Sequence, residues 1–298
     1  MNEHVALVAL LRTRPDGLSW PKLTEKVLEV GSAIAVWDHF NPEQLIPSPV
    51  ATAALADAET DLAAWDQEDL NFISVLDEDY PHQLRDILET PPFLFAQGEV
   101  VPDDQGMSVV GARKASDRGK DVAAKIANFL VSEGLTVIAG LAAGIDAAAH
   151  TAALAAGGRT VAFIGTGSTV SYPPQNRDLQ AAIAAKGLVL SQFWPDATPQ
   201  KYSFPMRNAL MSGYGLATIV VEAGETSGTR GQARAAVAHG RPVILTGSVV
   251  DGNEWARALL PRPGVHRIDS LADLGAVVDE IRAEPQRTSD ALSHFAFR

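Results

Sequence analysis

The chain contains no cysteine among its 298 residues, which excludes disulfides, thiolate metal sites and a cysteine nucleophile. Long apolar runs are also absent, since no stretch approaches the about 18 residues that span a bilayer, and we expect no membrane partner. The N-terminus lacks a cationic region followed by an apolar run and a small-residue cleavage site. With 46% hydrophobic and 20% charged residues, the composition is that of a globular protein. We therefore expect a cytoplasmic protein.

Positive charge is scarce in the first third of the chain. Residues 1–107 contain 5 lysines and arginines against 20 aspartates and glutamates, whereas residues 108–248 contain 13 against 8. The net charge of −12 argues against binding a polyanion, which is held chiefly through lysine and arginine. The middle segment is nevertheless a basic island in an acidic protein. Compositional drift also explains such an island, so it gains meaning only where it coincides with a site.

The first part of the chain has helical apolar spacing. The pattern predicts helices over 3–13 and 21–30, with Pro21 in a first helical turn, and two more over 32–40 and 51–70. These segments predict a small helical N-terminal domain over residues 1–68. Two strands are expected next, an entry strand in NFISVLDEDYP and an edge strand, introduced by prolines, in PPFLFAQGEV.

From residue 107 strands and helices alternate regularly, from MSVVGAR to RPVILT. This rhythm predicts an α/β fold, a doubly wound and mostly parallel sheet with helices on both faces. We place this core at 69–284, closed by a strand and helix in 264–281. Residues 285–298 are expected to form a flexible tail. In such a sheet, ligands bind outside the carboxyl ends of the strands.

The first strand exit, GARKAS, delivers two cations and a hydroxyl to that rim. Arg113, Lys114 and Ser116 lie beside a following helix N-terminus, which suits a phosphate. A solvated loop is the alternative.

The second exit, GLAAGIDAAAH, has two glycines that would leave backbone amides free at a helix N-terminus. Gly140 and Gly144 predict an anion-binding turn. Asp146 and His150 lie four residues apart on one helix face, and we expect them to hydrogen-bond each other. A second carboxylate or histidine at ligand spacing is lacking, so no metal is expected. An aspartate capping its own helix and a histidine packed on the sheet remain the alternative.

Two further junctions carry polar residues at the same rim. The third is GTGSTVSYPPQN, where a glycine-containing loop leads to a Tyr-Pro-Pro turn. The fourth combines FPMRN, at a helix start, with a run of hydroxyls and amides before another helix. The candidate residues here are Gly165, Gly167, Tyr172, Asn176, Arg207, Asn208, Ser227, Gly228, Thr229 and Arg230.

Taken in order, these motifs resemble a known family. Over roughly residues 72–248 the chain resembles the core of the DNA-processing protein A (DprA/Smf) family. The motifs that carry the resemblance are VVGARKAS, GLAAGIDAAAH, GTGSTVSYPPQN, FPMRN and VEAGETSGT. The resemblance implies an extended Rossmann-like fold that binds single-stranded DNA without marked sequence preference. It also implies a homodimer that protects incoming DNA and loads the recombinase RecA during natural transformation.

Functions carry over at matching positions. Arg113 matches the family's DNA-contacting arginine, and Lys201, Phe204 and Arg207 match the region lining the same pocket. The cations would neutralise phosphates and the Phe204 ring would stack on a base. The family's usual RNR string is Arg207-Asn208-Ala209 here, and we hypothesise that Arg230 replaces the lost cation. Asp146, His150, Tyr172, Asn176 and Glu222 are expected to support the pocket.

A nucleotide sensor or a phosphoribohydrolase-like enzyme on the same Rossmann-like fold is the alternative function. FPMRNALM and SGTRGQA resemble the motifs of those hydrolases, whose closing glutamate is Gln232 here. An amide cannot act as a general acid or base, which argues against hydrolysis, although Glu222 and Glu225 could stand in. We predict a non-catalytic protein with no cofactor.

Overall fold

The computed structural model describes residues 1–42 and 48–296, with side chains through Glu284. Its N-terminal part is helical, as the sequence predicts. The helices are α1 (Glu3–Thr13), α2 (Trp20–Val30), α3 (Ala33–Phe40) and α4 (Pro49–Gln67). Asn2, Ser32 and Ser48 cap three of them, because each side chain accepts a hydrogen bond from the backbone N–H three residues later. The predicted domain boundary at residue 68 falls between α4 and the first strand.

In the described part of the chain, nine strands form one mixed sheet in the order β1-β2-β6-β5-β4-β3-β7-β8-β9. Strands β3 to β9 pair in parallel, which confirms the predicted α/β class, and β1 and β2 add antiparallel pairs at one end. The strands are β1 (Asn71–Ser74), β2 (Phe93–Gly98), β3 (Gly106–Gly111), β4 (Thr136–Ala139), β5 (Thr160–Phe163), β6 (Leu188–Ser191), β7 (Ala217–Glu222), β8 (Val243–Thr246) and β9 (Val265–Ile268).

The predicted edge position of the second strand is wrong. Strand β2 lies between β1 and β6, and β1 is the edge. Pro91 and Pro92 precede the first paired residue, Phe93, so neither proline removes a donor from inside the strand. The prolines therefore mark where the strand begins and carry no information about its neighbours.

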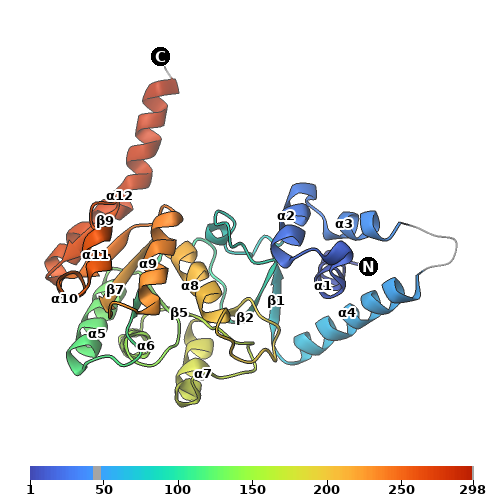
Figure 1. The fold of residues 1–298 in the computed structure, drawn as a ribbon, viewed down its shortest axis with the longest axis horizontal. Helices are drawn as coiled ribbons and strands as arrows, with labels where there is room; N and C mark the ends of the chain where they lie inside the picture. Colours follow the sequence, from blue (N-terminus) through green and yellow to red (C-terminus); the bar gives the residue numbers. More distant parts are fainter. Residues whose placement is uncertain (43–47, 297–298) are drawn as a thin grey trace.

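Residues of β3 pack into two separate hydrophobic clusters. Figure 1 shows α5 and α6 at the lower left of the sheet and α8 and α9 above them. Met107 and Val109 of β3 pack with α5, α6 and α12, whereas Val110 packs in the cluster that includes α8 and α9. The helices of this part are α5 (Asp117–Ser132), α6 (Ile145–Ala155), α7 (Arg177–Lys186), α8 (Ser203–Tyr214) and α9 (Gly228–Ala238). The short 3-10 turns are η2 (His82–Leu84) and η3 (Pro174–Asn176), and η1 (Pro15–Gly17) lies between α1 and α2.

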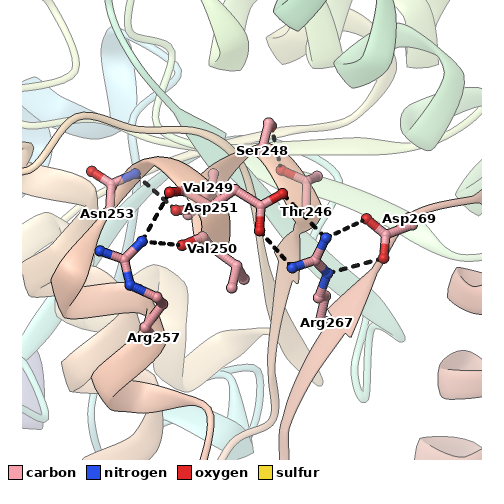
Figure 2. Close-up of polar contacts among 9 residues, drawn as sticks. All are labelled: Thr246, Ser248, Val249, Val250, Asp251, Asn253, Arg257, Arg267 and Asp269. Carbon is pink, nitrogen blue, oxygen red and sulfur yellow. Dashed lines mark hydrogen bonds and ion pairs between the residues drawn. The ribbon is translucent and has the colours of Figure 1, made fainter.

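The closing segment contains the predicted strand and helix, β9 and α12 (Leu271–Ala296), after two short helices that the sequence did not predict. These are α10 (Gly247–Gly252) and α11 (Glu254–Leu259). Figure 2 shows Arg267 of β9 between two carboxylates, 2.7 Å from Asp251 and 2.9 Å from Asp269. Arg257 donates to the carbonyl oxygen of Val250 at 3.1 Å (Figure 2). The segment predicted as a tail is helical through Ala296, and 297–298 lie outside the described residues.

The direction of the chain across the sheet reverses between β3 and β7. From β3 the strands run through β4 and β5 to β6 on one side, and through β7 and β8 to β9 on the other. A crevice forms at such a switch point because the connections on the two sides lead away from each other. The carboxyl ends of β3 and β7 therefore mark where a ligand site is expected.

Candidate nucleic-acid interface at the switch point

A cavity of about 830 Å³ lies at the switch point, between the end of β3, the loop after β4 and the starts of α8 and α9. We call it the switch-point cavity. Four arginines line it, namely Arg113, Arg207, Arg230 and Arg234, against a single carboxylate, that of Asp146. Four of the 13 lysines and arginines of the basic island therefore meet at one site. A concentration of arginines in a cavity favours an anionic ligand.

Arg113 and Phe204 form the open part of the cavity. The Arg113 side chain is exposed, and its guanidinium carbon lies 4.8 Å from the centroid of the Phe204 ring. The Tyr172 ring is 5.7 Å from Phe204, and a smaller cavity of about 170 Å³ between these rings also reaches Arg207. The surface thus offers a cation for a phosphate beside aromatic faces on which a base can stack.

Arg207 lies beneath this surface and is only 4% exposed. Its Nη1 donates to the carbonyl oxygens of Phe163, at 2.9 Å, and of Gly140. A Cβ atom at residue 140 would overlap the guanidinium, so glycine is required there by close approach. Burial lowers the pKa of Arg207 to about 10, which leaves it charged at neutral pH. Arg207 is a fixed positive charge at the base of the cavity.

Asp146 holds the loop after β4. Its Oδ2 accepts hydrogen bonds from the backbone N–H groups of Gly140, at 3.0 Å, and Ala142, at 3.4 Å. Burial raises the pKa of this carboxyl, while the charge of Arg207 acts in the opposite direction. The predicted free amide at Gly140 is therefore wrong, because Asp146 already occupies it. The carboxylate stabilises the turn from within the chain, which leaves anion binding to the arginines.

His150 is buried and plays a structural role. Its Nδ1 lies 2.6 Å from Thr160 Oγ1, and the predicted hydrogen bond to Asp146 is not found among the described contacts. Burial, followed by the positive charge of Arg207, lowers the pKa of His150 to about 3, so the ring is neutral. The structure therefore supports the alternative interpretation for His150 but not for Asp146, which accepts from amides that precede α6 and does not cap the helix. Within the described residues, no group of three His, Asp or Glu side chains could hold a metal.

The start of α9 supplies the second half of the cavity. Ser227 caps the helix, since its Oγ accepts from the Thr229 N–H at 3.2 Å. Arg230 and Arg234 follow on one face, and the sequence reasoning missed Arg234 although it lies one helical turn after Arg230. Gln232 is 2% exposed, lines the cavity, and its Nε2 has no hydrogen-bond partner among the described atoms.

The same region carries the match to known proteins. The model of the family described as DNA recombination-mediator protein A matches residues 71–261, which include every residue that lines the switch-point cavity. The chain belongs to this family. Relatives include Protein Smf of Synechocystis, 38% identical over 71% of this chain and 56% of that protein, and DNA processing protein DprA of Streptococcus pneumoniae, 41% identical over 60% and 64%. This chain thus spans about three fifths of the length of those two relatives.

Solved structures of the family share the fold. DNA processing protein A from Streptococcus pneumoniae superposes with a TM-score of 0.74 at 31% identity, over 93% of this chain and 98% of that one. DNA processing protein A from Helicobacter pylori, studied for its single-stranded DNA binding mode, gives a TM-score of 0.60 at 22% identity, over 73% of this chain and 97% of that one. The first of these extends the likeness to nearly the whole chain.

Some residues that the sequence predicts to bind the ligand lie outside the switch-point cavity. Ser116 donates from its backbone N–H and its Oγ to Glu222, at 3.0 and 2.5 Å. Both residues line a separate cavity of about 370 Å³ on the side of α5 and α12. The hydroxyl that the sequence assigns to phosphate is therefore engaged by a carboxylate. Lys114 is exposed and does not line the switch-point cavity.

The remaining predicted residues divide into those that line a cavity and those that do not. The backbone N–H of Gly167 donates to the carbonyl oxygen of Ala197 at 2.8 Å, and Asn176 Nδ2 donates to that of Leu141 at 2.9 Å. Lys201 is exposed before α8 and is not among the residues lining the cavity, and neither is Gly144. Gly165 lines the smaller neighbouring cavity, and Asn208, Gly228 and Thr229 line the switch-point cavity itself.

Proposed function

We propose that this chain binds single-stranded DNA in the switch-point cavity. The observation that carries the proposal is the convergence of four arginines with the Phe204 ring in a protein whose net charge is −12. Phosphates would contact Arg113 and Arg230, and a base would stack on Phe204. The relative from Helicobacter pylori, whose single-stranded DNA binding mode has been described, adds support.

A single strand fits these features better than a duplex. Phe204 is half-buried under Arg113, so an aromatic contact needs a base that has left its stack. Bases of a single strand are splayed at little cost, whereas extracting one from a duplex costs a few kcal/mol, on the order of 2–4. The cavity is therefore suited to one or two unpaired nucleotides, with the chain of phosphates continuing along the arginines.

The wider role that we propose is that of a non-catalytic mediator. The protein would act in the cytoplasm as a homodimer, protect incoming single-stranded DNA and load RecA during natural transformation. Family membership supports this role, and so does the lack of a carboxylate other than Asp146 in the lining of the cavity. Asp146 is engaged by backbone amides, which leaves no free carboxylate there for acid or base catalysis.

A nucleotide sensor is the second candidate, favoured by the volume of the cavity, which is within the range of small-ligand sites. The hydrolase version has less support. Gln232 replaces the expected glutamate, and the two stand-ins lie elsewhere: Glu222 accepts from Ser116 and Glu225 accepts from the backbone N–H of Glu254 at 2.9 Å. Competition by mononucleotides for the DNA site would distinguish sensor from mediator.

The test of the proposal is the salt dependence of binding to a fluorescent oligothymidylate, measured by anisotropy for the wild type and for Arg113→Ala. We expect log Kd to change linearly with log salt, because each phosphate contact releases counterions. Loss of one phosphate contact in Arg113→Ala should weaken binding and reduce the slope of log Kd against log salt by about 1.

Arg118→Ala is the matched control. Arg118 is an exposed arginine five residues away that lines the 370 Å³ cavity instead. It should leave both affinity and slope close to those of the wild type. If the two variants behave alike, DNA is attracted by general charge and the site assignment fails. If the wild type does not bind at low salt, the DNA role fails and nucleotides become the ligands to test.

A further inference from the structure

A second concave surface lies far along the sheet from the switch-point cavity. It is a groove of about 1340 Å³ between α1, α4 and the loop after β6, and we call it the aromatic groove. Three tryptophans form its floor: the Trp194 ring lies 5.3 Å from Trp20 and 5.6 Å from Trp65. Figure 1 shows α1 and α4 at the β1 end of the sheet, away from α9. Binding of DNA at the switch point leaves this groove unexplained.

The rim of the aromatic groove is acidic. Asp57, Asp61, Glu68 and Asp196 line it, against Arg12 and Arg14. Asp57, Glu68 and Asp196 are exposed, and none of them forms an ion pair within the described residues. Burial raises the pKa of Asp61, the charge of Arg12 opposes this rise, and the charges of Asp57 and Asp196 add to it. Such a rim attracts cations.

Arg12 shows how the groove holds a guanidinium group. Its Nη2 lies 2.5 Å from Asp61 Oδ2, while its guanidinium carbon lies 5.4 Å from the Trp194 ring. A carboxylate thus binds the edge of the cation and an indole face covers its plane.

The Trp65 ring is buried between Trp194 and Phe72, so Trp20 and Trp194 are the partly exposed indoles of the groove. The carboxylates of Asp57 and Glu68 line the same groove. These indoles and carboxylates provide the same two elements for cations from outside the chain.

We propose that the aromatic groove docks a basic segment of a protein partner, in which arginines alternate with apolar side chains. The arginines would pair with the free carboxylates and the apolar side chains would cover the tryptophans. Nucleic acid is disfavoured there, because phosphates would meet four carboxylates. The proposal does not depend on the DNA site, and the two surfaces could be occupied together, since they share no lining residue.

The test uses the full chain and a peptide with four Arg-Ala-Leu repeats, which contains no tryptophan. Three of the protein's five tryptophans line the groove, so tryptophan emission reports on occupancy. We expect a saturable change in emission. Asp57→Asn combined with Glu68→Gln should raise the Kd by about fivefold, as expected for two partly exposed ion pairs. Both substitutions are at exposed positions, and thermal unfolding checks that the fold is retained.

The control is Glu59→Gln combined with Asp66→Asn. These residues are also exposed on α4, carry the same charge and do not line the groove. The control should bind the peptide within about twofold of the wild type, because their carboxylates would not contact it. The proposal is overturned by any of three results. These are no saturable change at low salt, equal weakening by both double variants, or equal binding of a Glu-Ala-Leu peptide.

Discussion

Replacement of Arg207 by methionine should lower both stability and DNA affinity. Methionine keeps the length and apolar bulk of the stem, but the carbonyl oxygens of Gly140 and Phe163 lose their donor. Asp146 loses the cation that opposes its desolvation. We expect the free energy of unfolding to fall by about 3–5 kcal/mol, which is the cost of removing one partner from a buried pair of opposite charges. Urea denaturation measures this change.

The same variant should weaken single-stranded DNA binding by about tenfold or more, because a charge-assisted hydrogen bond contributes about 1.5–3 kcal/mol. Anisotropy at a temperature where the variant is folded measures this effect. Arg234→Met provides the comparison, since Arg234 lines the same cavity but is exposed. It should reduce affinity without a change in stability. Unchanged stability in Arg207→Met would contradict the buried role that we assign to Arg207.

Mild acid should destabilise the protein through His150. The folded-state pKa of His150 is about 3, against an ordinary value of 6.5 for histidine, so the unfolded chain takes up a proton that the folded chain does not. Stability therefore falls as pH drops below about 6.5, by up to about 1.4 kcal/mol per unit, and the loss between pH 7 and 5 should be about 2 kcal/mol. Urea denaturation at the two pH values measures it.

His150→Gln separates this effect from the rest of the pH dependence, since glutamine has no proton to gain. The variant should be less stable at pH 7 but lose about 2 kcal/mol less than the wild type on acidification. Asp146 acts in the opposite sense, because a raised carboxyl pKa favours the folded state as pH falls through it. An unchanged loss in His150→Gln would assign the acid sensitivity to other groups.

The fold was predictable because its elements have strong local signals. The helices of the N-terminal part have helical apolar spacing, and apolar strands alternate with helices from residue 107 onward. The order of the strands was not predictable in this way. Which strand forms the edge depends on pairing between distant segments, as the central position of β2 shows. The short helices α10 and α11 also escaped detection, since each has only six residues.

The sequence predicts which polar residues lie at the carboxyl ends of the strands, but it does not predict their hydrogen-bond partners. Arg113 comes from the loop before α5, and Phe204 and Arg207 come from the first turns of α8; the fold brings them together. Ser116 has the same kind of position, yet its hydroxyl bonds to Glu222, which is 106 residues later. Likewise, the Gly140 amide is taken by Asp146. Sequence indicates which polar groups reach the rim, whereas their partners depend on the tertiary structure.

The reversal between β3 and β7 means that a nucleic-acid strand in the cavity would link two halves of the molecule. Arg113 and Asp146 come from the half that runs toward β6, and Arg230 and Arg234 come from the half that runs toward β9. The bound nucleic acid would then hold the two halves together, because local separation of the halves would require its release. At a concentration one hundred times its Kd, it would add about 2.7 kcal/mol to the stability of the closed sheet. Proteolysis near α9 should therefore be slower when nucleic acid is bound than when it is absent.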